Sequence, residues 1–220
     1  MPSGPRILIT AGPTHEPIDA VRYIGNRSSG RLGRAIADAA ETADCPATLL
    51  LGPVTEPPRD QKTPHEAAVI RFRRTHDLQE LIRNHWPAHD ILIMAAAVCD
   101  FMPASEMPGK GPRRSGPVSL DLIPTPDLLQ EAASTSRSDQ TLIGFALEAS
   151  SELEQKAREK LKRKGVHAIV ANPLDTMDSD TIDGLLLLPD GPSHAPGGPL
   201  PKEAFAAWLI DRILELHAER

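Results

Sequence analysis

Short apolar runs alternate with longer amphipathic segments through most of the chain. Six runs of five or six residues are dominated by apolar side chains. Runs this short and this apolar are typical of strands that are buried on both faces of a sheet. We therefore expect strands at residues 6–10, 47–51, 68–72, 90–95, 141–146 and 167–171. The segments between them follow a helical pattern and predict helices at about residues 29–43, 75–86, 127–134 and 151–164.

This alternation predicts an α/β fold in which a mostly parallel sheet carries helices on both faces. The last third of the chain is less regular. Residues 183–191, DGLLLLPDG, suggest an antiparallel strand, residues 192–201 a loop, and residues 202–217 a final helix. A chain of 220 residues of which 40% are hydrophobic can bury one substantial core. We therefore expect a single domain over residues 1–220 with an irregular C-terminal flank.

Charge and cysteine content narrow the classes of function. The net charge of -6 and the pI near 5.7 argue against a nucleic-acid binder, because such proteins usually need a basic face. Cys45 and Cys99 are too few for a disulfide framework or a zinc cluster, which favours reduced thiols. The sequence shows neither a signal peptide nor an apolar run long enough to span a bilayer. We expect a cytoplasmic protein that binds neither nucleic acid nor membrane.

The loops at one edge of the predicted sheet are the expected place for a ligand. In a parallel sheet ligands bind beyond the carboxyl ends of the strands, which directs attention to the loops after Thr10, Ala95 and Ala146. The first loop, residues 11–27, is long for a strand-to-helix connection, and long ordered loops are usually functional. The second includes residues 101–117, which are rich in Gly, Pro and basic residues and predict a mobile flap.

Residues 25–33, GNRSSGRLG, resemble two kinds of phosphate-binding loop and match neither. They have the glycine spacing of a P-loop but not its Lys and Ser/Thr, and they lack the full dinucleotide fingerprint G-x-G-x-x-G. Ser28 or Ser29 can cap a helix that begins near Gly30, so that its free backbone N–H groups and its dipole would attract an anion. An ordinary capped helix would show the same residues, but the long loop before it favours a binding role.

Several residues near these loops are candidate ligands. The amide of Asn26 can donate and accept hydrogen bonds, and the planar guanidinium of Arg22 can reach a phosphate or carboxylate. The small residues at 95–97 leave room for a ligand near the backbone, and Asp100 follows them at a strand end, where carboxylates bind ribose or metal. Each residue also has an ordinary reading, as a turn or surface residue.

Lysines in two distant segments could supply positive charge. Lys110 lies in the flap and could move onto phosphates that gather charge during a reaction, with help from Arg113 and Arg114. Lys160 and Lys164 are one helical turn apart and share a face, so they could clamp a triphosphate. Taken alone, such lysines are usually just solvated.

Taken together, several segments resemble phosphopantothenoylcysteine synthetase, the phosphopantothenate–cysteine ligase of coenzyme A biosynthesis. They are ITAGPTHEPIDAVRYIGNRSSGRLG, AAAVCDF, Lys110, TPDLL, GFALEA and KLKRKGVHAIVANP, within about residues 7–172. The resemblance implies a Rossmann-like three-layer fold, a homodimer, and CTP or ATP with Mg2+ as co-substrate. It also implies that 4'-phosphopantothenate is activated as an acyl-nucleotide, an acyl-cytidylate if CTP is used, before the amine of L-cysteine displaces the nucleotide. In many bacteria a flavin-dependent decarboxylase precedes this domain. Nothing of it is found in this sequence, so we expect a separate phosphopantothenoylcysteine decarboxylase and no decarboxylation here.

The resemblance also implies roles for particular residues. Asn26 and Lys110 would be catalytic, Asn26 holding the carboxylate and acyl-nucleotide and Lys110 facing the phosphates. The residues implied for substrate binding are Arg22, Asn26, Ser28, Ser29, Gly30, Ala96 and Ala97, with Arg22 reaching the substrate from its own subunit or across the dimer. Residues implied for nucleotide binding are Asp100, Thr125, Pro126, Asp127, Leu128, Phe145, Lys160 and Lys164. The sequence identifies no metal ligands.

The sequence departs from the family pattern at two places, and two other functions stay open. The flap reads Lys-Gly-Pro-Arg at residues 110–113, where the family usually has Lys-Ile-Lys-Lys, and Thr125 replaces the more familiar Asn. A non-catalytic nucleotide-binding protein on the same scaffold is one alternative, because the altered flap could disable chemistry. An NAD(P)-dependent reductase is less favoured, since the fingerprint is missing and Tyr23 has no lysine four residues later. The sequence does not decide between CTP and ATP.

Overall fold

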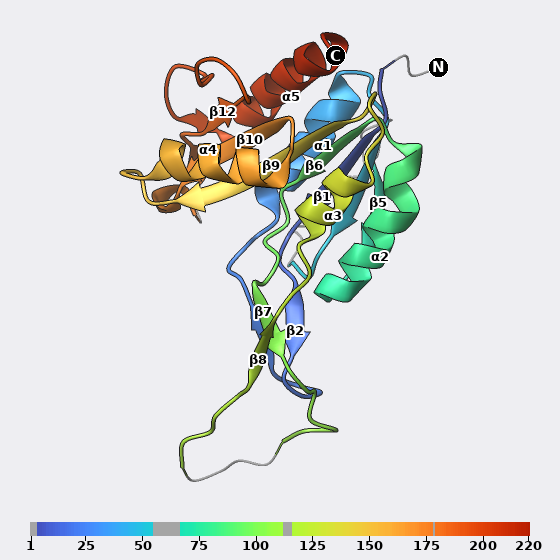
Figure 1. The fold of residues 1–220 in the computed structure, drawn as a ribbon, viewed down its shortest axis with the longest axis vertical. Helices are drawn as coiled ribbons and strands as arrows, with labels where there is room; N and C mark the ends of the chain where they lie inside the picture. Colours follow the sequence, from blue (N-terminus) through green and yellow to red (C-terminus); the bar gives the residue numbers. More distant parts are fainter. Residues whose placement is uncertain (1–3, 55–66, 112–115, 178) are drawn as a thin grey trace.

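The computed structural model describes residues 4–54, 67–111, 116–177 and 179–220, and a seven-stranded sheet lies at its centre (Figure 1). The strand order is β12-β10-β9-β6-β1-β4-β5. The strands are β1 (Ile7–Ala11), β4 (Ala47–Leu51), β5 (Ala68–Arg71), β6 (Ile91–Met94), β9 (Thr141–Glu148), β10 (Ala168–Pro173) and β12 (Leu185–Leu187). Neighbouring strands are parallel except β10 and β12, which are antiparallel.

Helices cover both faces of this sheet (Figure 1). One face carries α2 (Thr75–His85), α3 (Leu128–Ser134) and α4 (Leu153–Lys164), and the other carries α1 (Arg31–Thr42) and α5 (Lys202–Ala218). Short 3-10 turns form η1 (Trp86–Ala88) and η2 (Leu174–Thr176). Within the described ranges, no helix combines the length and the apolar content that crossing a bilayer requires. The predicted three-layer α/β fold is confirmed.

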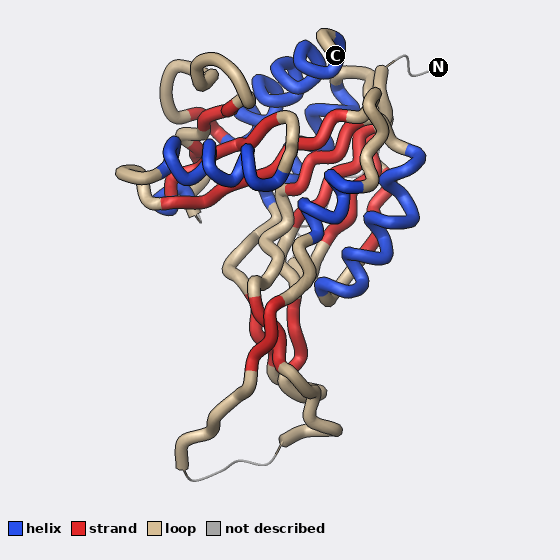
Figure 2. The backbone as a smooth tube through the Cα atoms, viewed as in Figure 1, coloured by secondary structure: helices blue, strands red, loops and turns tan. Residues whose placement is uncertain are grey.

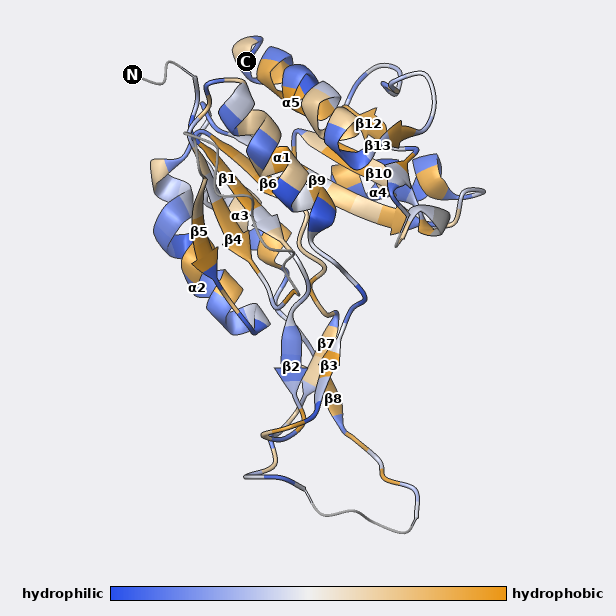
Figure 3. Cartoon of the chain, turned by 180° about the vertical axis from the view of Figure 1, so that it is seen from behind, coloured by the Kyte–Doolittle hydropathy of each residue, from blue (hydrophilic) through white to orange (hydrophobic). Residues whose placement is uncertain are grey.

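The burial of β1 explains why the strands read as continuous apolar runs. Ile7 and Ile9 pack in the core beneath α1 and α5, whereas Leu8 between them packs in the core beneath α2, α3 and α4. All three side chains are fully buried. Because successive side chains of a strand point to opposite faces, a strand with a core on each side is apolar at most positions, and the one polar residue of β1, Thr10, is buried and hydrogen-bonded. Figure 3 shows this as orange strands at the centre of the molecule.

Most boundaries of the predicted elements agree with the structure, and the differences lie in the C-terminal third, around α1 and in the arm described below. The predicted antiparallel strand within residues 183–191 is confirmed as β12. The predicted loop at 192–201 ends in β13 (Leu200–Pro201), which pairs with β11 (Thr181–Ile182). These two-residue strands form by pairing across some twenty residues of chain, so no local apolar pattern marks them.

An arm of short strands projects from the carboxyl edge of the sheet (Figures 1 and 2). Its strands are β2 (His15–Pro17), β3 (Tyr23–Gly25), β7 (Phe101–Pro103) and β8 (Leu122–Pro124). β2 pairs with β3 and β7 with β8, both antiparallel. We call these strands, with residues 18–22, 104–111 and 116–121, the arm. Most of the predicted flap at 101–117 belongs to it, whereas residues 112–115 lie outside the described residues.

The arm exposes apolar side chains. Those that are more than a third exposed are Val21, Tyr23, Phe101, Val118, Leu120, Leu122 and Ile123. Exposed apolar side chains are ordinary when scattered, but a concentration of them on one projecting element marks a candidate contact surface.

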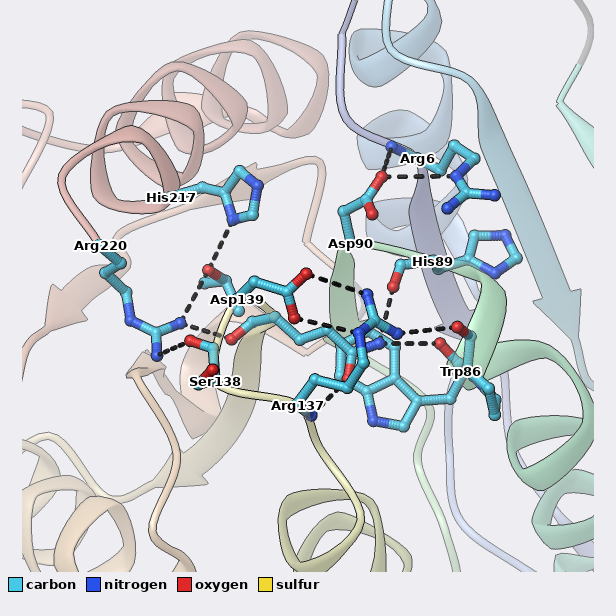
Figure 4. Close-up of polar contacts among 12 residues, drawn as sticks. Arg6, Trp86, His89, Asp90, Arg137, Ser138, Asp139, His217 and Arg220 are labelled. Atoms are coloured by element: carbon cyan, nitrogen blue, oxygen red, sulfur yellow. Dashed lines mark hydrogen bonds and ion pairs between the residues drawn. The ribbon is translucent and has the colours of Figure 1, made fainter.

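Hydrogen bonds close the opposite, amino end of the sheet (Figure 4). The buried Gln140 donates through Nε2 to the carbonyl oxygens of Trp86, at 3.0 Å, and His89, at 2.7 Å. Arg220, after α5, donates to the Gln140 carbonyl and to Thr141 Oγ1. These contacts tie η1, β9 and the end of α5 together. The amino end of the sheet is therefore held by structural contacts. The carboxyl end carries the arm and the cavity described next.

Candidate functional site

A cavity of about 830 Å³ lies beyond the carboxyl ends of β6 and β9. Its volume is in the range of small-molecule binding sites. Its lining comes from chain segments that are far apart in sequence, chiefly residues 25–33, 94–100, 125–129, 145–147 and 160–164. The position agrees with the rule that ligands bind beyond the carboxyl ends of parallel strands.

The start of α1 forms one wall, and it corrects the prediction of a serine cap. The N-cap is Gly30, at φ 69°, and no side chain caps this helix in the described structure. Instead, the Gly30 N–H donates to Ser28 Oγ at 3.4 Å. Glycine suits this left-handed conformation, which a serine would adopt only with strain. The helix therefore begins at Arg31, later than expected, and its first amides border the cavity without a serine cap.

A second glycine brings α1 close to the sheet. A Cβ at Gly33 would collide with the Cβ of Ala11 on β1. The helix start is thus held directly over the end of a buried strand. This close packing fixes the position of the first-turn N–H groups relative to the cavity.

Asn26 links two walls of the cavity. Its Nδ2 donates to the carbonyl oxygen of Val98 at 2.9 Å, which joins the end of β3 to the loop after β6. This bond sets the orientation of the amide, because the nitrogen must face the carbonyl. Asn26 is exposed and lines the cavity. Its amide is therefore both oriented and accessible to a ligand.

The loop after β6 presents small residues and one carboxylate. The Ala96 N–H donates to Thr10 Oγ1 at 3.1 Å, and the Ala97 N–H donates to the Gly12 carbonyl at 2.9 Å. These bonds hold the backbone against β1. Asp100 follows, exposed, and its backbone carbonyl accepts from the Thr125 N–H at 3.0 Å. The backbone of Ala96 and Ala97 and the carboxylate of Asp100 thus face one space.

Two lysines of α4 form a cationic wall. Lys160 Nζ donates to the Phe145 carbonyl at 2.6 Å, and burial lowers the pKa of Lys160. Lys164 is paired with Asp127, which also caps α3 by accepting from the Gln130 N–H at 3.1 Å. Burial lowers the pKa of Lys164 as well, and the nearby negative charge of Asp100 opposes that effect. A bound polyanion would favour the charged form of both lysines for the same electrostatic reason.

The structure brings together every predicted site residue except Arg22 and Lys110. The predicted residues that line the cavity are Asn26, Ser28, Ser29, Gly30, Ala96, Ala97, Asp100, Thr125, Pro126, Asp127, Leu128, Phe145, Lys160 and Lys164. Arg22 and Lys110 lie on the arm, where Arg22 is paired with Asp19 and Lys110 is exposed. Arg113 and Arg114 lie outside the described residues. The roles of all these residues stay predictions.

Some lining residues were not predicted. Arg163, Asn172 and Lys202 also line the cavity. Asn172 Oδ1 is buried and has no hydrogen-bond partner among the described residues, so it has the capacity to accept from a ligand. Asn172 lies near the end of β10, and the strand-end rule that directed attention to three other loops could have found it. Lys202 is 7% exposed at the start of α5, and no sequence pattern marks a lysine as buried.

The described residues of this cavity could bind magnesium only as an ion that a triphosphate ligand brings with it. Among the described residues, no group of three or more His, Cys, Asp and Glu side chains is arranged to hold a metal. Mg2+ on a triphosphate needs only one or two protein carboxylates, because phosphate and water oxygens complete its shell. Asp100 is exposed in the cavity, whereas Asp127 is already paired with Lys164. The residues present therefore fit a nucleotide-borne Mg2+ near Asp100.

Comparison with known sequences identifies relatives along nearly the whole chain. Residues 2–216 match the family model described as the C-terminal domain of DNA/pantothenate metabolism flavoproteins. The coenzyme A biosynthesis bifunctional protein CoaBC of Mycobacterium bovis is 35% identical over 226 residues, which cover 96% of this chain and 52% of that protein. A cysteine/cysteine sulfinic acid decarboxylase from an unknown prokaryotic organism is 44% identical over 172 residues, which cover 78% of this chain and 46% of that protein. The chain thus spans about half the length of these curated relatives.

Solved structures share the fold. The crystal structure of the C-terminal domain of CoaBC superposes with a TM-score of 0.81 at 29% identity, covering 99% of this chain and 97% of that one. A Cab2 mutant in complex with phosphopantothenate-cysteine gives a TM-score of 0.78 at 18% identity, covering 98% and 88%. At that identity the second match supports the fold alone.

Proposed function

We propose a function that follows from the family of this chain. The chain belongs to the family of the C-terminal domain of DNA/pantothenate metabolism flavoproteins. We propose that it joins 4'-phosphopantothenate to L-cysteine in coenzyme A biosynthesis. One observation carries the proposal. The oriented amide of Asn26, the start of α1, the carboxylate of Asp100 and the lysines of α4 line one cavity. The CoaBC relatives, named for coenzyme A biosynthesis, support it.

The chemistry requires that a carboxylate be activated, because neither carboxylate oxygen is a leaving group for an amine. We expect a carboxylate oxygen of phosphopantothenate to attack the α-phosphorus of CTP or ATP. An acyl–phosphate bond forms as the bond between the α- and β-phosphates breaks, and pyrophosphate leaves. The cysteine amine then attacks the acyl carbon and loses a proton, and the nucleoside monophosphate leaves as the acyl–oxygen bond breaks.

The residues of the cavity suit these steps. Asn26 and the first amides of α1 would hold the oxygens of the mixed anhydride. Lys160 and Lys164 would balance the charge of the triphosphate, and Asp100 would contact the nucleotide. A magnesium ion bound to the triphosphate would neutralise charge on the phosphates. None of these roles requires a P-loop lysine, because the lysines come from a different helix.

We further propose a homodimer that forms through the arm. Its exposed apolar side chains support this, and so does the position of Arg22 and Lys110 outside the cavity of their own chain. A second copy's arm could bring these two cations to the site. Val118→Asp should therefore lower the mass measured by light scattering from that of a dimer to that of a monomer. A dimer that persists in this variant would place the interface elsewhere.

A nucleotide competition assay tests the reaction. The protein is mixed with phosphopantothenate, cysteine, and equal CTP and ATP, and CMP, AMP, pyrophosphate and the amide product are quantified. We expect pyrophosphate and one nucleoside monophosphate in equal amounts, CMP more than AMP. Nucleotide binding without pyrophosphate release would favour the non-catalytic alternative. A phosphopantothenoylcysteine decarboxylase would act on the product next.

A further inference from the structure

Asp19 is a buried carboxylate in the arm, outside the cavity. Its side chain is fully buried and accepts hydrogen bonds from three parts of the arm. Oδ1 accepts from the N–H groups of Val21, at 2.9 Å, and Arg22, at 2.8 Å. Oδ2 accepts from the Arg22 guanidinium, through Nε at 2.9 Å and also through Nη2, and from the Gly111 N–H at 3.0 Å. All of these partners are donors, so a carboxylate suits the position better than an amide.

These contacts hold the segment that carries Lys110. The Met107 N–H donates to the Ile18 carbonyl at 2.9 Å, and the Ala20 N–H donates to the Gly109 carbonyl at 3.0 Å. On the other side of Lys110, the Gly111 N–H binds Asp19. The backbone is therefore fixed to the turn at residues 18–22 both just before and just after Lys110.

Gly111 packs closely against this contact. A Cβ at this position would force Arg22 Nη2 to shift and would lie 3.1 Å from Asp19 Oδ2. The Gly111 carbonyl also accepts from Arg22 Nη2 at 3.4 Å. Asp19, Arg22 and Gly111 thus form one compact contact, which we call the arm clamp.

We propose that Asp19 is a positioning residue that holds Arg22 and Lys110 together as one unit and presents both cations to the ligase site. This inference rests on the proposed function. Asp19 does not line the cavity, so its effect must pass through the two cations that it positions. Its pKa is held well below the usual range, chiefly by the hydrogen bond from Arg22, so the clamp stays charged at any pH used for an assay.

Two measurements on the full chain test the proposal. Asp19→Asn keeps the size of the side chain but turns an NH2 group toward Arg22 and Gly111. Asp121→Asn removes an exposed carboxylate from the same arm and serves as the matched control. Amide hydrogen exchange is followed at Gly111 and Ala20, and ligase kinetics are measured for Asp19→Asn, Lys110→Ala and the double variant.

We expect Asp19→Asn to speed exchange at Gly111 at least tenfold, and Asp121→Asn to leave it unchanged. In turnover, Asp19→Asn should lower kcat at least as much as Lys110→Ala, because it displaces Arg22 as well as Lys110, with little change in KM for cysteine. The double variant should lose no more than Asp19→Asn alone, because Asp19→Asn already removes Lys110 from its position. Losses that add, or Gly111 exchange at the normal rate, would overturn the proposal.

A second variant covers the case in which Asp19→Asn unfolds the arm. Gly111→Ala leaves Asp19 intact but displaces the Arg22 guanidinium from its place beside Oδ2, and it should show both effects in weaker form. Normal exchange and turnover in Gly111→Ala would contradict the clamp. If the unmodified protein releases no pyrophosphate, the proposed function fails, whereas the exchange data still report whether Asp19 holds the Lys110 segment.

Discussion

Acid should destabilise this fold through one half-buried histidine, His167. His167 lies just before β10, and its Nδ1 accepts a hydrogen bond from the Leu142 N–H at 2.9 Å. A protonated ring would carry a hydrogen on Nδ1 and could not accept this bond. Burial, and to a lesser extent the positive charge of Arg220, lower the pKa of His167 from 6.5 to about 4. The folded state therefore needs the neutral ring.

The sign and size of the effect follow from this difference in pKa. Between pH 6.5 and pH 4 the unfolded chain binds a proton at His167 and the folded chain does not, so stability falls as the pH falls through this window. The difference between 6.5 and about 4 corresponds to about 3 kcal/mol of unfolding free energy, most of which is lost by the time the pH has fallen to 4. By the same relation, about 2 kcal/mol should be lost at pH 5.

Urea unfolding followed by circular dichroism measures this loss. The free energy of unfolding is determined at pH 7.5, 6 and 5 for the protein, for His167→Gln, and for His76→Gln, which changes an exposed histidine on α2. His167→Gln should be less stable at pH 7.5 but should lose about 2 kcal/mol less between pH 7.5 and pH 5. His76→Gln should follow the unmodified protein. If all three proteins lost the same stability over this range, the reasoning about His167 would be refuted.

Three further predictions concern the site and the amino end of the sheet. Asn26→Asp loses the donor to Val98 and sets a negative charge beside a bound carboxylate, so nucleoside monophosphate formation should fall at least about tenfold, unlike in the exposed control Asn84→Asp. Unchanged turnover in Asn26→Asp would count against the assignment. Lys110→Ala should slow pyrophosphate release more than amide formation, because charge gathers on the phosphates in the first step, and a normal rate of pyrophosphate release would exclude that role. Gln140→Leu leaves the His89 carbonyl without its donor and removes one of two donors to the Trp86 carbonyl, so it should cost about 2 kcal/mol in urea unfolding with unchanged turnover, whereas a change near zero would mean that water replaces the amide.

The central sheet could be predicted because each of its long strands appears in the sequence as a local run of apolar residues. β1 has a core on both faces, so four of its five residues are apolar, and the run is visible without knowledge of its neighbours. The arm could not be predicted in this way. Its strands are three residues long, and β7 pairs with β8 across about twenty residues, Phe101 opposite Pro124. Their pairing joins residues that are far apart in sequence, and buried polar contacts such as that between Gly111 and Asp19 hold the arm. No apolar periodicity reveals either feature.

Site residues could be predicted where they follow strands. They could not be predicted where their position depends on the backbone conformation. The rule for strand ends indicated the loop that contains Asp100, and helical spacing indicated Lys160 and Lys164. The serine cap was wrong because sequence preference at helix starts does not specify the left-handed conformation that Gly30 adopts. Arg163 lies within the basic run at residues 160–164, and the sequence does not show that its side chain lines the cavity, because that depends on how α4 packs.

The lysine pair shows most clearly what sequence spacing leaves out. Spacing predicts that Lys160 and Lys164 share a face, but not that Asp127 from another segment already neutralises Lys164. A triphosphate that binds Lys164 must therefore replace Asp127, and its affinity depends on the difference between the two ion pairs. The side chain of Asp127 is 40% exposed and that of Lys164 only 11%, so the carboxylate can regain water when the pair separates, whereas the ammonium needs the phosphate. If a triphosphate binds here as we propose, the exposed Asp127 would leave the pair and the more buried Lys164 would stay to bind the phosphate.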